Sequence, residues 1–67
     1  MIQVTVNGAV HRFERGLDVS SLLAELRLAG KKIAVERNGE ILPRGAHAGT
    51  SVADGDRFEI VVAVGGG

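Results

Sequence analysis

Cysteine is absent from this 67-residue sequence, and proline and aromatic residues are scarce. Without cysteine the chain has no disulfide bond, no cysteine-ligated zinc and no iron–sulfur cluster, so hydrophobic packing must stabilise the fold. Proline occurs once, and the aromatic residues are Phe13 and Phe58. The length allows one domain with one modest core.

Excess charge of either sign is also missing, because eight Lys and Arg residues balance eight Asp and Glu residues. Nucleic-acid-binding proteins usually have a basic surface and aromatic residues that stack on bases, so the sequence argues against a nucleic-acid partner. No apolar run approaches the roughly 20 residues of a membrane-spanning helix, and the N-terminus lacks the basic segment of a secretion signal. We therefore expect no membrane partner and a cytoplasmic location.

Apolar and polar residues alternate from Ile2 to Val6, which predicts a half-buried strand. Asn7-Gly8 is a typical tight-turn sequence and predicts a hairpin with a second strand over residues 9–14, in which Phe13 faces the core. A similar pattern predicts strands over residues 33–37 and 40–42 around the turn Asn38-Gly39, the second one ended by Pro43.

A helix is predicted between these hairpins. Asp18 is a suitable N-cap, and Gly30 is a suitable residue to follow the last helical turn. Apolar residues recur between them at helical spacing, which predicts about three turns. These residues are Val19, Leu22, Leu23, Leu26 and Ala29.

The last strand is predicted over residues 57–64, after an irregular segment with a short helical turn over residues 44–52. Asp54-Gly55-Asp56 lacks the other ligands of a calcium loop and is interpreted as a turn. The order ββαβββ, with the first and last strands parallel at the sheet centre, is that of an α+β, β-grasp (ubiquitin-like) fold. We expect a mixed sheet of four to five strands over residues 1–64, with one main helix on one face.

Gly65, Gly66 and Gly67 form a tail without side chains, which we predict to be flexible. Extended, three residues reach roughly 10 Å, and they fit a channel too narrow for other residues. An α-carboxyl group has an unperturbed pKa of about 3.3 to 3.7, so a carboxylate at Gly67 is ionised at neutral pH and able to attack the α-phosphate of ATP. The alternative is a frayed terminus or a cloning spacer.

Other candidate sites are weaker. Val61 and Ala63, with Ile41 nearby, are predicted to form an apolar docking patch at the base of the tail, or else to fill a second buried face. His11 and His47 have no partners at metal or triad spacing and are interpreted as surface residues. We predict no catalytic residue and no metal site in this chain.

Several segments together resemble the ThiS family of sulfur carriers, in the ThiS/MoaD group of ubiquitin-like proteins. The resemblance covers essentially the whole chain. The matching segments are Val6-Asn7-Gly8, Gly16-Leu17-Asp18-Val19 before a Leu-Leu helix, Ala34 to Arg44, Asp54-Gly55-Asp56, Ile60-Val61 and the glycine tail.

The resemblance implies a carrier in thiamin (thiazole) biosynthesis that is a co-substrate rather than an enzyme. An E1-like, ThiF-like adenylyltransferase would use ATP and Mg to adenylate Gly67, while Gly65 and Gly66 are threaded into its active site. A sulfur donor such as a cysteine desulfurase would then supply a persulfide that yields a thiocarboxylate. A ThiG-like thiazole synthase would take the sulfur, and this chain itself would bind no cofactor.

Two alternatives remain open at the level of sequence. MoaD-like carriers for molybdopterin, and carriers for tRNA thiolation or cysteine synthesis, share the fold and tail. Molybdopterin carriers tend to be longer and commonly have an aromatic residue near the tail, where this chain has Val62-Ala63-Val64. The second alternative is a β-grasp interaction module that works through one face and does not need its tail.

Overall fold

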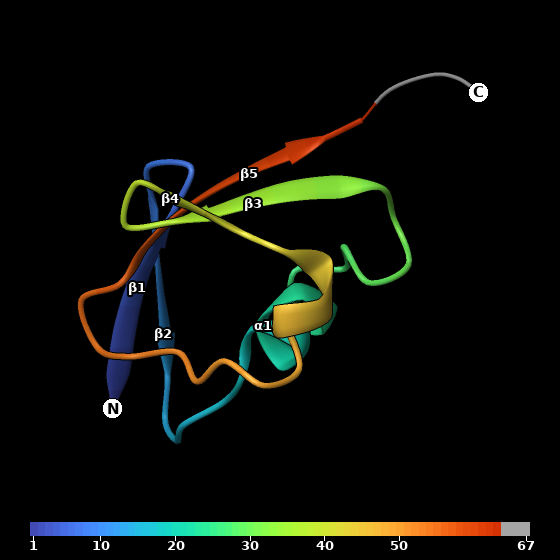
Figure 1. Cartoon of the computed structure of the whole chain (residues 1–67). Helices are drawn as coiled ribbons and strands as arrows, with labels where there is room; N and C mark the ends of the chain where they lie inside the picture. Colours follow the sequence, from blue (N-terminus) through green and yellow to red (C-terminus); the bar gives the residue numbers. More distant parts are fainter. Residues whose placement is uncertain (64–67) are drawn as a thin grey trace.

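The computed structural model describes residues 1–63, which form one five-stranded mixed sheet with a helix packed on one face (Figure 1). The order ββαβββ agrees with the prediction. The elements are β1 (Ile2–Val6), β2 (Ala9–Phe13), α1 (Val19–Glu25), β3 (Ile33–Arg37), β4 (Glu40–Leu42), the 3₁₀ helix η1 (Arg44–Ala46) and β5 (Arg57–Val62).

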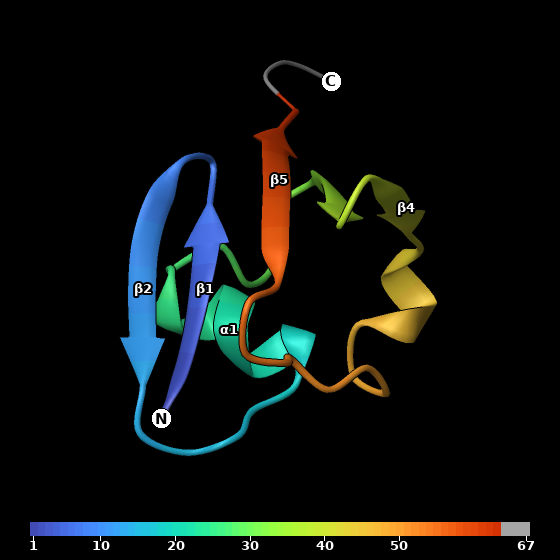
Figure 2. The same ribbon diagram turned by 90° about the vertical axis from the view of Figure 1, so that its left-hand side faces the viewer.

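The sheet order is β2-β1-β5-β3-β4, so the last strand lies at the centre. β5 runs parallel to β1, with Thr5 opposite Arg57, and antiparallel to β3, with Val35 opposite Ile60. Figure 2 looks onto the sheet with α1 behind it. This topology confirms the predicted β-grasp architecture.

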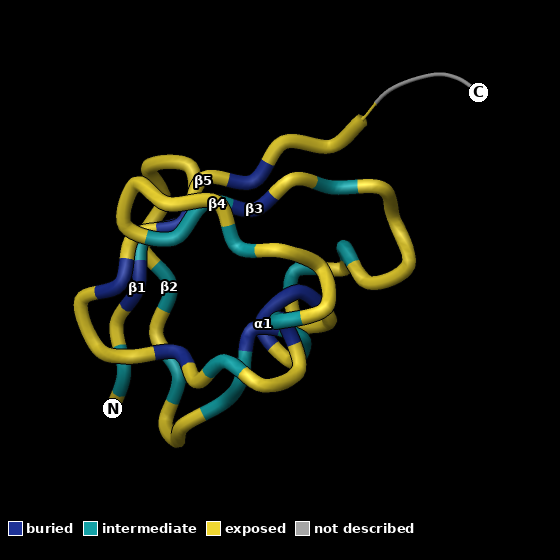
Figure 3. The backbone as a smooth tube through the Cα atoms, viewed as in Figure 1, coloured by how far each residue is buried: buried dark blue, intermediate teal, exposed yellow. Residues whose placement is uncertain are grey.

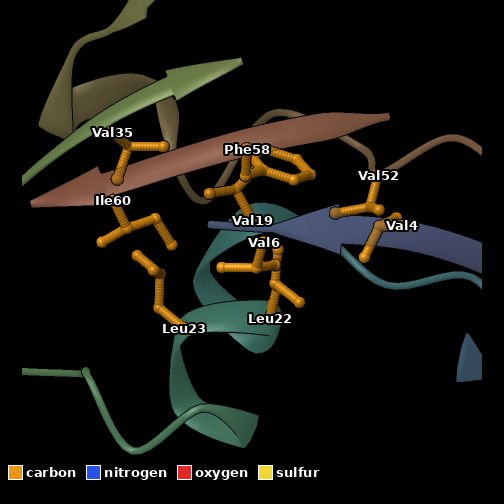
Figure 4. Close-up of a cluster of buried hydrophobic side chains, with 9 residues drawn as sticks. All are labelled: Val4, Val6, Val19, Leu22, Leu23, Val35, Val52, Phe58 and Ile60. Atoms are coloured by element: carbon orange, nitrogen blue, oxygen red, sulfur yellow. The ribbon is translucent and has the colours of Figure 1, made fainter. Parts of the chain in front are cut away.

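The core lies between the sheet and α1 (Figure 4). Alternate strand residues point toward the helix, and the helix contributes residues spaced three to four apart, which is the pattern that buries one face of each element. The buried apolar residues are Val4, Val6, Val19, Leu22, Leu23, Val35, Val52, Phe58 and Ile60.

The helix begins as predicted but ends earlier. Asp18 accepts a hydrogen bond from the Ser21 N–H at 2.8 Å, and this bond lowers the pKa of the Asp18 carboxyl group. At the other end Arg27 takes a left-handed conformation with φ +61°, so the helix closes one turn before Gly30. The Leu28 N–H then donates to the Leu23 carbonyl at 2.8 Å, which is a Schellman closure.

His47 is buried, so the prediction of a surface histidine is wrong there. The turn after Pro43 folds into η1 and carries His47 inward, where its Nε2 lies 3.2 Å from the Leu42 carbonyl oxygen. His11, on the edge strand β2, is partly exposed.

Within residues 1–63, no helix combines the length and the apolar character that a membrane crossing requires. In the same residues, no three His, Cys, Asp or Glu side chains are grouped as metal ligands would be.

Candidate functional site at the end of β5

β5 is fixed at its start by a buried carboxylate. Asp56 accepts hydrogen bonds from the Arg37 Nε at 2.9 Å, the Asn38 Nδ2 at 3.1 Å and the Ala53 N–H at 2.9 Å. Burial alone would raise the pKa of Asp56, but these donors and the Arg37 charge outweigh it and hold the pKa below its usual value. Asp56 is thus part of a fixed network as well as the turn that the sequence predicted.

β5 is fixed in its middle by the amide of Asn7. The Asn7 Nδ2 donates to the Ile60 carbonyl at 2.9 Å, and the Ile60 N–H donates to the Asn7 Oδ1 at 2.7 Å. β1 has already turned away at this point, so the side chain continues the pairing that the β1 backbone would have supplied.

Asn38 also makes two hydrogen bonds to the backbone of β5, near the start of that strand. Its Oδ1 accepts the Arg57 N–H at 2.9 Å, while its backbone N–H donates to the Arg57 carbonyl at 2.8 Å. Asn7 and Asn38 both have positive φ, at 49° and 51°, as the predicted Asn-Gly turns require. The two turns therefore also hold the central strand, a role that turn chemistry alone did not reveal.

At its end, β5 remains attached to the sheet through the last described residue. The Ala63 N–H donates to the Lys32 carbonyl at 2.8 Å, one step beyond the Ile33–Val62 pair. The backbone pairing therefore continues to Ala63, and β5 runs alongside β3 (Figure 1).

The predicted docking residues, Val61, Ala63 and Ile41, are all exposed to solvent. Val61 is 65% exposed and Ile41 is 68% exposed, and Ala63 is exposed as well. Figure 3 shows the end of β5 in the colour of exposed residues. Val61 does not fill a second core, because its strand neighbour Ile60 is the residue that faces α1. Ile41 and Val61 belong to different strands, β4 and β5, with β3 between them. Ala34 of β3 lies opposite Val61, and the docking role of these residues stays a prediction.

The predicted modified residue and threaded tail, Gly65 to Gly67, lie outside the described residues, as does Val64 of the predicted last strand. The tail register therefore stays a prediction.

The sequence model of the ThiS family matches residues 4–67 of this chain. Thiazole synthase of Paramagnetospirillum magneticum is 42% identical over 66 residues, which cover 98% of this chain and 20% of that protein. Thiazole synthase of Magnetococcus marinus is 35% identical, with the same coverage. The chain thus spans about a fifth of the length of these curated relatives.

A solved structure has the same fold along its whole length. The crystal structure of the thiamine biosynthesis protein ThiS from Geobacter metallireducens superposes with a TM-score of 0.82 at 39% identity. The match covers 98% of this chain and 100% of that chain.

Proposed function

This chain belongs to the ThiS family, and from that premise we propose that it is a sulfur carrier of thiamine biosynthesis that carries sulfur on Gly67. The observation that carries the proposal is the family match, which extends through the glycine tail to residue 67. The geometry of β5 supports it, because side-chain and backbone bonds hold this strand up to Ala63.

Three steps follow from the chemistry of a C-terminal carboxylate. The Gly67 carboxylate attacks the α-phosphorus of ATP, forming an acyl adenylate and releasing pyrophosphate. A persulfide of the sulfur donor then attacks the acyl carbon and displaces AMP, which gives an acyl disulfide. A thiol attacks the donor's sulfur of that disulfide, forms a new disulfide with the donor and releases the thiocarboxylate. The ionised carboxylate needs no general base in the first step.

The partners of this proposal are enzymes that act on the tail. An E1-like adenylyltransferase would hold ATP and Mg, and a cysteine desulfurase would supply the persulfide. We propose a cytoplasmic location, in which ATP is available for these steps. This chain holds neither cofactor and contributes the carboxylate as a co-substrate.

Thiazole synthase is the proposed acceptor of the sulfur. Two proteins with that name contain a segment similar to 98% of this chain within a longer polypeptide. A carrier segment within the same polypeptide as an enzyme is kept at high effective concentration next to it, which favours the view that the two work together.

Gly65 and Gly66 are the proposed threaded segment. Glycine lacks a Cβ atom, so two consecutive glycines before Gly67 let the backbone pass through a narrow channel to the reacting atoms. A side chain at Gly66 would widen the tail where the channel is expected to be narrowest.

Intact-mass measurement tests the proposal. The 67-residue polypeptide is incubated with ATP, the adenylyltransferase of the same organism, a cysteine desulfurase and cysteine. We expect replacement of one oxygen by sulfur, and subsequent loss of that sulfur to thiazole synthase rather than to molybdopterin synthase. An unchanged mass with enzymes that are active on another carrier would refute the carrier function.

A further inference from the structure

The uncovered sheet face carries two like charges directly opposite each other. Glu36 of β3 pairs with Glu59 of β5 in the antiparallel register, and both point away from α1 because their neighbours Val35 and Ile60 are buried in the core. Side chains at opposite positions of such a pair have Cβ atoms about 4.5 to 5.5 Å apart, and like charges there are destabilising. We refer to Glu36 and Glu59 as the acidic pair.

The acidic pair has no ionic partner in the part of the chain that the structure describes. The one ion pair among residues 1–63 joins Arg37 to Asp56. Arg57 lies two positions before Glu59 on the same strand, yet it forms no ion pair with either glutamate. The two glutamates are therefore opposite each other without an ion-pair partner among residues 1–63.

Apolar side chains flank the acidic pair on two sides. Ile41 of β4 lies opposite Glu36. Val61 lies two positions after Glu59 on β5 and is opposite Ala34 of β3. Ile41 and Val61 are among the most exposed large apolar residues of the described chain. The acidic pair with these apolar neighbours is complementary to a partner surface on which a cationic side chain is surrounded by apolar residues.

We propose that the uncovered face binds the adenylyltransferase through an arginine or lysine of that enzyme, which enters between Glu36 and Glu59. A guanidinium has five donors in a planar fork and is able to bridge two carboxylates. Contacts of Ile41 and Val61 with the enzyme exclude water around the charges and strengthen this interaction.

The place of the acidic pair in the sheet suits this partner. Glu59 lies on β5 four residues before Ala63, the last residue that the structure describes. An enzyme that receives the residues after Ala63 must lie next to this end of β5 (Figure 2). The inference rests on the proposed carrier function and adds the chemistry by which the domain is recognised.

Steady-state kinetics of pyrophosphate release, with this carrier as the varied substrate, test the inference. For Glu36→Gln/Glu59→Gln we expect the KM for the carrier to rise about tenfold with kcat unchanged, since only docking is weakened. The KM of the wild type should also rise with salt more steeply than that of the variant. Glu25→Gln, the same chemical change on the helix layer, is the matched control and should leave KM unchanged.

Thermal unfolding of the same proteins separates docking from folding. The double variant should unfold at the wild-type temperature or above it, because the repulsion between opposite glutamates is removed. Val61→Ser should also unfold near the wild-type temperature and raise KM. If wild type is adenylated and both variants keep its KM, the docking inference is wrong while the carrier function stands. If wild type is not adenylated, both fail.

Discussion

Asn7 shows how one residue of this chain serves both a turn and the functional strand. Its positive φ belongs to the hairpin between β1 and β2, and its amide makes two hydrogen bonds to the Ile60 backbone. Sequence predicted the turn because Asn-Gly is a local signal. It gave no indication of the bonds to Ile60, since they join residues 53 positions apart.

Replacing Asn7 with glycine separates the two roles. Glycine tolerates the positive φ, so the turn remains, but the two bonds to Ile60 are lost. We expect Asn7→Gly to lower the free energy of unfolding by about 1 to 3 kcal/mol, measured by urea denaturation. A loss no larger than that of the control Glu14→Gly, at an exposed position outside the strands, would show that the amide does not hold β5.

Asp56 predicts the response of the fold to acid. Its pKa in the folded state lies below the unfolded value of about 3.9, so the ionised carboxylate stabilises the native state. That contribution is fully present above the unfolded pKa and is lost as the pH falls through the folded pKa. Asp18, whose pKa is also lowered, acts in the same direction.

Urea denaturation of the wild type and Asp56→Asn from pH 7 down to about pH 3 measures this contribution. The variant should be less stable at neutral pH, because the Arg37 charge loses its partner, and the difference between the two proteins should shrink as the solution is acidified. A constant difference across the pH range would contradict the assigned role of Asp56.

At the scale of elements, α1 shows where a periodic pattern misleads. Leu26 and Ala29 continue the helical spacing, which predicted an end at Gly30, but the backbone turns left-handed at Arg27. Glycine or asparagine would have indicated a left-handed residue at this position, whereas arginine does not. The Schellman closure instead matches Leu28 with Leu23, so both apolar residues still pack against the core side.

This closure predicts a stabilising substitution. Arg27→Gly should raise the free energy of unfolding by about 0.5 to 1 kcal/mol, because glycine has no steric penalty at φ +61°. Glu25→Gly, two positions earlier at the last residue of the helix, should lower it by about 0.5 to 1 kcal/mol. Chemical denaturation that gives both substitutions the same sign would be inconsistent with a helix end between these positions.

The strands and the loop elements differ in how far sequence predicts them. Alternation and Asn-Gly turns were sufficient for β1 to β5, because each signal is local. Burial of His47 was not predicted, since it depends on the turn of η1 that brings its ring to the Leu42 carbonyl at the end of β4. The network of Asp56 was missed for the same reason, because its donor Arg37 comes from another strand.

At the scale of the whole molecule, the fold and the tail have separate tasks. The described domain has its own core and a central strand held from both sides, while the proposed chemistry takes place after Ala63. The proposed docking face includes Val61 near the end of β5, and the tail follows this strand in the sequence. Sequence located this end, but it did not reveal the acidic pair, which depends on the register between β3 and β5.

Removing Gly66 and Gly67 tests this separation. The thermal unfolding temperature should remain at the wild-type value, because the core residues all precede Ala63. Sulfur transfer should be abolished, as measured by thiazole formation with the partner enzymes. A truncated chain that still supports thiazole formation would favour an interaction module that does not use its tail.

The most direct test of the carrier account is to locate the sulfur within the chain. After reaction with ATP, the adenylyltransferase and the persulfide donor, the protein is digested and its C-terminal peptide is fragmented by mass spectrometry. We predict that the added sulfur is in the carboxyl group of Gly67. Sulfur found at any other residue, or absent from the peptide while the enzymes are active on another carrier, would contradict the account.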